Sequence, residues 1–255
     1  ILMDFGVSVT TYTLMMLHGA DLGREEGIKK YGMKSKYRIV PRDFGTYRGK
    51  RVFDIERVCV ANNTMSYADY LDCRRFSFIT HLFTYSVFFP LKKLMKEELN
   101  ISFFEFVWSI FQNLEKDNNK ANLNTNSLKK FPKLYFEFSR ECKQELFDSK
   151  EDIYAYYSKD ENYNKLLSSE LGDNLLRKYS ARIICNALTE VIDFSIDLIP
   201  KMIAKDVLSK NEIRGILESS RLWLTNLHIF DAVFNWEKEK NNETIINLEY
   251  DVPSW

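Results

Sequence analysis

The pattern of apolar residues changes near Thr64, and this change constrains the fold more than any other feature of the sequence. Before it, residues 7–17 and 52–61 are apolar and rich in β-branched side chains, which is typical of buried strands. After it, apolar residues recur every three or four positions, which is typical of helices that bury one face. We therefore predict an α/β segment over residues 1–63 and a mostly α-helical C-terminal domain over residues 64–255.

Helix-start signals support the helical domain. Ser66 and Asp69 form a capping box, in which a serine and an acidic residue three positions later satisfy free backbone amides, and the same signal recurs at Ser102 and Ser209. The predicted helices cover residues 66–89, 103–114, 131–147, 150–158, 163–167, 172–205 and 209–238, with a kink at Pro200. The sequence also predicts a hairpin turn over residues 45–49, an exposed loop over 116–127 and a short strand or extended tail over 243–252.

The composition gives little information about partners. The 36 basic residues balance the 36 acidic ones, so the net charge does not indicate a nucleic acid or an anionic membrane. The longest uncharged run, residues 76–91, is shorter than the ~20 residues that a membrane-spanning helix needs, so we expect no membrane span. No secretory signal is visible, and the four cysteines are scattered, so we expect a reducing, cytoplasmic location.

Three segments of the first third of the chain carry a resemblance to a known family. Residues 14–19, 31–45 and 52–66 resemble the C-terminal part of radical S-adenosylmethionine (SAM) proteins, in particular the subgroup with a cobalamin-binding domain ahead of the barrel. In that family a late barrel strand leads into a tight turn, followed by a Gly-Met-Lys-Thr-Lys-like segment and a last strand. Gly32-Met-Lys-Ser-Lys36 is similar to that segment. The resemblance implies that residues 1–63 are the end of a β/α barrel.

The resemblance also implies cofactors that this sequence does not hold by itself. Such proteins bind a four-iron, four-sulfur cluster through a Cys-x3-Cys-x2-Cys run and use SAM, in some cases with cobalamin. Here the cysteines stand at positions 59, 73, 142 and 185, and none of them share that spacing. We therefore expect a C-terminal fragment that is inactive alone and has no metal site of its own. Its partner would be the missing N-terminal part of the same chain, which would supply the cluster.

The turn at the end of the first predicted strand is one candidate site. In a parallel barrel, loops that follow strands form the active face, so His18 and Gly19 there are candidates for cofactor or substrate contact. The alternative is structural. In that interpretation Gly19 forms the turn, Asp21 caps a helix that begins near Leu22, and His18 packs beneath them.

A cluster of cations follows. Arg38 and Arg42 lie in a run rich in Lys and Arg, and guanidinium groups suit carboxylate or phosphate recognition, so both are candidates for holding an anionic group at the barrel mouth. The alternative is a solvated loop whose cations balance Asp43, Asp54 and Glu56.

Two carboxylates are candidates for acid–base chemistry. Asp54 and Glu56 share one face of a predicted strand, an arrangement that can serve proton transfer. They can equally pair with Arg51 and Arg57 at an exposed edge.

Three functions remain open at this point. The first is the C-terminal portion of a radical SAM enzyme, with or without cobalamin, whose helical domain covers the barrel and shapes a small-molecule substrate site. The second is a non-catalytic helical binding or assembly module. The third is a small hydrolase that uses His18 and Asp21, for which the sequence offers no clear nucleophile. His81 and His228 lie in apolar helical runs and are interpreted as core residues.

Overall fold

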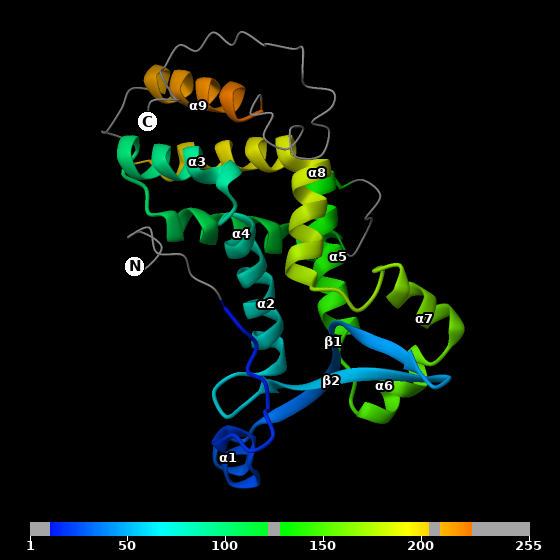
Figure 1. Cartoon of the computed structure of the whole chain (residues 1–255). Helices are drawn as coiled ribbons and strands as arrows, with labels where there is room; N and C mark the ends of the chain where they lie inside the picture. The colour runs from blue at the N-terminus through cyan, green and yellow to red at the C-terminus, as the bar shows by residue number, and fades with distance from the viewer. Residues whose placement is uncertain (1–10, 122–127, 204–209, 226–255) are drawn as a thin grey trace. The chain divides into compact units, whose positions relative to one another are not determined.

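The computed structural model describes residues 11–121, 128–203 and 210–225, and most of them are helical (Figure 1). The chain divides into two compact units. Unit 1 draws on residues 78–136 and on residues from Tyr179 onward, and unit 2 consists of residues 11–77 and 137–178. The unit boundary falls inside three helices, α2 (Tyr67–Leu82), α5 (Lys130–Gln144) and α8 (Leu175–Ile196). The predicted division at residues 63 and 64 stays a prediction.

A β-hairpin organises unit 2. Strand β1 (Lys34–Tyr47) pairs antiparallel with β2 (Lys50–Ala61), so that Arg38 lies opposite Glu56. Arg48 and Gly49 form the tight turn, with left-handed φ values of 49° and 76°. Left-handed residues at such a turn match the twist of the two strands. A hairpin turn thus lies within the predicted range 45–49, but it is shorter than predicted, because residues 45–47 belong to β1.

The predicted barrel end is wrong. Among the described residues the sheet has two strands, paired antiparallel and not closed. The first predicted strand, where it is described, makes an isolated antiparallel bridge from Met15 to Val58. The second predicted strand, residues 52–61, pairs with β1, whose residues 34–42 were interpreted as an anion-binding run or a solvated loop. Because a two-residue turn reverses the direction of the chain, the strands that it joins pair antiparallel. A β/α barrel instead needs crossover connections between parallel strands.

A wide bulge interrupts the hairpin. Ile39 lies opposite Ile55 and Phe44 lies opposite Phe53, so residues 40–43 face a single residue of β2. Pro41 has no backbone N–H to donate to a ladder, and Arg42 adopts a left-handed φ of 64°. The bulge therefore bends β1 away from regular pairing and turns Arg42 outward.

Helices pack against the hairpin within unit 2. The core there joins Ile39 and Phe53 of the hairpin to Ile153, Tyr157, Tyr163 and Leu166. The last four residues belong to α6 (Lys150–Tyr157) and α7 (Asp160–Leu167). A 3-10 turn η2 (Asp21–Gly23) and helix α1 (Glu25–Tyr31) precede β1.

Unit 1 is helical where it is described and has an aromatic core that includes Phe83, Phe88 and Phe106. Its further elements are η3 (Ser86–Phe88), α3 (Phe89–Lys93), the π-helix η4 (Leu94–Glu98), α4 (Phe103–Ala121), η6 (Ile199–Lys201) and α9 (Lys210–Thr225). None of the helices in the described ranges is long and apolar enough to cross a membrane.

Several predicted helix limits need correction. The helix predicted over 66–89 ends at Leu82, and short helical turns follow it. The helix predicted over 172–205 ends at Ile196, is already non-helical at Ala187, and Pro200 lies in the separate turn η6. Helix α4 continues to Ala121, into the predicted loop. The predictions for residues 226–238 and 243–252 and for His228 lie outside the described residues.

Candidate small-molecule pocket

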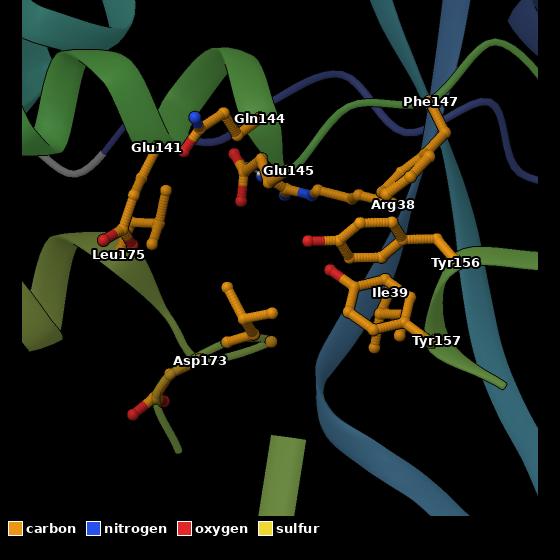
Figure 2. Close-up of a pocket in the computed structure, with 12 residues that line it drawn as sticks. Arg38, Ile39, Glu141, Gln144, Glu145, Phe147, Tyr156, Tyr157, Asp173 and Leu175 are labelled. Atoms are coloured by element: carbon orange, nitrogen blue, oxygen red, sulfur yellow. Dashed lines mark hydrogen bonds and ion pairs between the residues drawn. The ribbon is translucent and has the colours of Figure 1, made fainter. Parts of the chain in front are cut away.

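Unit 2 contains a pocket of about 350 Å³ between β1, the end of α5, α6 and the loop that leads into α8 (Figure 2). Its lining combines charged, aromatic and aliphatic side chains. The lining residues are Arg38, Ile39, Glu141, Gln144, Glu145, Phe147, Tyr156, Tyr157, Leu171, Gly172, Asp173 and Leu175. A cavity of this volume lies at the lower end of the range for small-molecule sites.

The bulge in β1 fixes one side of the pocket. The backbone N–H of Arg42 donates to the carbonyl oxygen of Gly172 over 3.0 Å. The Arg42 guanidinium donates two hydrogen bonds to the Asp173 carboxylate, of 3.1 and 2.8 Å. Although partial burial works in the opposite direction, Arg42 and the backbone N–H of Asn174 hold the pKa of Asp173 below its ordinary value. The loop and its carboxylate are thus tied to the strand.

A backbone bridge fixes the opposite side. Tyr37 and Phe147 exchange two backbone hydrogen bonds of 2.9 and 2.8 Å, which attach the end of α5 to β1. Ser149 then caps α6, accepting a hydrogen bond of 3.0 Å from the backbone N–H of Asp152. These contacts set the start and direction of α6, the helix that carries the tyrosines of the pocket.

Two tyrosines of α6 face the cavity. The rings of Tyr156 and Tyr157 lie 4.9 Å apart, edge to face, and both contact Phe147. Figure 2 shows their hydroxyl groups pointing into the cavity, toward the side where Glu145 lies. Burial raises the pKa of Tyr157 well above its ordinary value, and the neighbouring Tyr156 and Glu145 add to the effect. Tyr157 therefore offers a neutral hydroxyl at physiological pH.

A network of ion pairs lies behind the wall of the pocket. Arg38 pairs with Glu56 across the hairpin and donates from Nη1 to Oε1 of Glu145 over 3.0 Å. Arg74 of α2 donates to the same oxygen over 3.1 Å. All four side chains are at least four-fifths buried. Although burial works against the charged form, Glu145 and Glu56 raise the pKa of Arg38 above its ordinary value. The network holds the Glu145 carboxylate in place at the edge of the cavity.

The thiol beside this network is not a nucleophile. Cys142 is buried next to Arg74, and burial raises the pKa of its thiol to about 12. A nucleophilic cysteine requires the thiolate, which this pKa excludes near neutral pH.

The structure brings Arg38, Arg42 and Glu56, three of the predicted site residues, to this region. The predicted role of the two arginines was to hold an external anion, but each is paired with a carboxylate of the chain itself. Residues 34–47 form β1 rather than a loop, but the charge balance that the alternative included is found in the pair of Arg38 with Glu56. Glu56 faces Arg38 as an ion-pair partner, and Asp54, which lies opposite the bulge, is exposed.

The remaining predicted residues lie elsewhere in unit 2. His18 and Gly19 occupy an exposed turn, with Gly19 at a left-handed φ of 86°. Gly19 thus forms the turn as the structural alternative expected, but His18 does not pack beneath it. Asp21 begins the 3-10 turn η2 and does not cap a helix. The expected pairing of the β2 carboxylates with Arg51 and Arg57 is absent, since Arg51 pairs with Asp160 and Arg57 donates to Ser35.

Sequence reasoning missed the residues that make the pocket a site, namely Glu145, Tyr156, Tyr157 and Asp173. The only local signal was the run Tyr154-Ala-Tyr-Tyr157. On a helix these tyrosines point in different directions, so that Tyr157 is buried whereas Tyr154 and Tyr156 are exposed. Glu145 and Asp173 carry no local signal, because their partners are distant in the sequence. Arg74 and Arg38 lie 71 and 107 residues from Glu145, and Arg42 lies 131 residues from Asp173.

The described residues do not fit an iron–sulfur cluster. They contain no group of three or more His, Cys, Asp or Glu side chains that could hold a metal ion. Cys59 and Cys142 are buried, whereas Cys73 and Cys185 are exposed. The lining of the pocket contains no cysteine and therefore offers no thiolate ligand for such a cluster.

Comparison with known proteins found no family model that matches the chain and no similar curated protein.

Proposed function

We propose that this chain is the C-terminal part of a radical SAM enzyme and that unit 2 binds part of a small-molecule substrate. The observation that carries the binding role is the pocket, where tyrosine hydroxyls and a carboxylate converge on one cavity. The three segments that resemble the family build the hairpin of this unit, and they supply the bulge and Arg38. The cluster and SAM would be held by another part of the enzyme.

In this proposal the residues of the pocket bind and orient. Glu145, held by Arg38 and Arg74, accepts hydrogen bonds from the substrate, and Tyr157 donates or accepts one. Ile39 and Leu175 cover an apolar face and exclude water from it. Since radical chemistry depends on the position of the reacting atom, fixed hydrogen bonds of this kind would select which bond of the substrate is presented.

The proposed location is the cytoplasm. All four cysteines are free thiols, which suits a reducing compartment. The proposed partners are a small-molecule substrate and the missing N-terminal part of the same chain, and no partner nucleic acid is proposed.

A non-catalytic binding module is the second candidate, and one observation favours it. Both edges of the hairpin are partly paired within unit 2, β2 with Met15 and β1 with Phe147. A unit that pairs the backbone groups at the edges of its own strands does not need a neighbouring barrel to pair them.

The codons upstream of Ile1 separate the two candidates. If the chain is part of a radical SAM enzyme, we expect the same reading frame to continue upstream of Ile1 and to encode a Cys-x3-Cys-x2-Cys run. A start codon directly at this boundary, or a longer frame without the cysteine run, would refute the enzyme and leave the binding module.

A further inference from the structure

We propose that the pocket of unit 2 binds a neutral, hydroxyl-rich small molecule of the size of a monosaccharide or a cyclic polyol. This inference names the class of ligand for the proposed binding site. It rests on the proposed function only because it takes the same pocket as the binding site. Three features of the pocket lead to this ligand, namely its charge balance, its unused hydrogen-bonding groups and its aliphatic wall.

The charges in and directly behind the pocket wall cancel. Four cations, Arg38, Arg42, Arg74 and Lys178, are paired with four carboxylates, Glu56, Glu141, Glu145 and Asp173. A charged ligand would add one charge that no group of the site balances, and its desolvation would not be repaid. A neutral ligand avoids this cost, so the pocket favours molecules without net charge.

Hydrogen-bonding groups nevertheless remain unused inside the cavity. Tyr157 is only 4% exposed, and its hydroxyl makes no hydrogen bond to any residue in the described ranges, although it points into the cavity (Figure 2). Glu145 uses Oε1 for both arginines, and its Oε2 has no hydrogen-bond partner among the described residues. Both groups are therefore open to hydrogen bonds from a ligand in the cavity.

These groups match the chemistry of hydroxyls. Glu145 Oε2 accepts only, whereas the Tyr157 hydroxyl both donates and accepts. A ligand hydroxyl can donate to the carboxylate, and a neighbouring hydroxyl on the same ring can accept from Tyr157. The amide of Gln144, also in the lining, adds another donor and acceptor. A polyol presents such pairs of hydroxyls on adjacent carbons.

The rest of the lining suits the carbon skeleton of such a ligand. Ile39, Leu171 and Leu175 present aliphatic surface, and Phe147 adds an aromatic ring. The C–H face of a sugar ring or cyclic polyol is apolar and can cover this surface. The volume, about 350 Å³, lies at the small end of ligand pockets, which favours a single ring over a nucleotide-sized ligand.

The test compares ligands that share one ring and differ in charge. Glucose and myo-inositol are the neutral probes, glucosamine the cationic probe and glucose 6-phosphate the anionic probe. Binding of each to the full-length protein is measured by saturation-transfer NMR and by titration. We expect at least one neutral probe to bind about tenfold more tightly than either charged probe, because the charged probes bury an uncompensated charge.

A pair of variants locates the binding. Tyr157→Phe removes one hydroxyl and keeps the ring, so we expect it to weaken the neutral probe about three- to tenfold, the value of one neutral hydrogen bond. Tyr154→Phe is the matched control, because Tyr154 lies on the same helix outside the pocket lining. It should bind the probe like the unchanged protein.

Three outcomes would overturn the proposal. They are tighter binding of a charged probe, no binding of either neutral probe, and equal effects of the two tyrosine variants. None of these measurements requires the cluster or SAM, so a negative result leaves the radical SAM proposal standing. Conversely, an upstream frame without the cysteine run would leave the ligand class untouched.

Discussion

Gly172 shows how one residue shapes the pocket. It adopts a left-handed φ of 65°, and its carbonyl oxygen accepts the hydrogen bond from the bulge at Arg42. A Cβ at this position would lie 2.5 Å from Cδ2 of the buried Leu166. The loop therefore requires glycine both for its backbone conformation and for its close approach to α7.

We expect Gly172→Ala to lower the free energy of unfolding by about 2 to 3 kcal/mol, since left-handed strain and a displaced leucine add together. Gly49→Ala is the matched control. Its φ is also left-handed, at 76°, but no atom lies within 4 Å of the added Cβ, so the expected loss is only about 1 kcal/mol. Urea denaturation of both variants measures the difference. Equal losses would show that the contact with Leu166 does not constrain the loop.

Glu145 is the second residue on which the site depends. Glu145→Gln keeps the shape but removes the charge that two buried arginines share, so we expect a loss of about 2 to 4 kcal/mol in the free energy of unfolding. Glu161→Gln removes one partner of an exposed pair with Lys165 and should leave the unfolding midpoint unchanged. If the two variants unfolded alike in urea, the buried network would not contribute to stability.

Among the individual residues, the sequence indicated part of the site. The cations of residues 34–42 singled out Arg38 and Arg42, and strand alternation singled out Glu56. Glu56 is a nearby partner of Arg38, but the other two carboxylates, Glu145 for Arg38 and Asp173 for Arg42, lie more than 100 residues away from these arginines. They meet only because the end of α5 and the loop before α8 fold onto β1. No local pattern reports such a contact, so the arginines were assigned an external anion.

Among the elements, the start of α2 was predicted most accurately. The Ser66 backbone N–H donates to the Asp69 carboxylate over 2.8 Å, and the Asp69 backbone N–H donates to the Ser66 hydroxyl over 3.1 Å. These are the two reciprocal bonds of a capping box. They form between residues three apart, which is why sequence alone sufficed.

The capping box gives a prediction for pH. The hydrogen bonds from Ser66 lower the pKa of Asp69 below its ordinary value of 3.8. Its stabilising contribution is therefore complete above that value and is lost as the pH falls through the lowered pKa of the folded state. We expect Asp69→Asn to be less stable than the unchanged chain at pH 7, and the difference to shrink at pH 3. Urea denaturation at both pH values tests this, and a difference that did not depend on pH would contradict it.

The hairpin was the element that sequence reasoning misjudged. Residues 34–42 are mostly polar or charged and include Pro41, a combination that indicates a loop. They form a strand because Ile39 and Tyr37 find partners in β2 and at Phe147, and because the bulge accommodates Pro41 outside the ladder. Tertiary contacts override local propensity here. The helices were predicted more reliably, because their apolar spacing is a local signal, although their ends were not.

For the whole molecule, the sequence did not indicate which segments form one compact unit. Unit 2 combines the hairpin with α6 and α7, which are separated from it in the sequence by a long run of helices. The apolar pattern shows that a helix buries a face but not which element covers it. The assembly of distant segments into one unit was therefore invisible in the sequence.

We propose above that this pocket-bearing unit belongs to a radical SAM enzyme. The most direct test is to purify the full-length protein without oxygen, add SAM and a reductant, and measure 5′-deoxyadenosine. We expect the protein to contain iron and to cleave SAM. A well-folded, full-length protein that contains no iron and leaves SAM intact would contradict it.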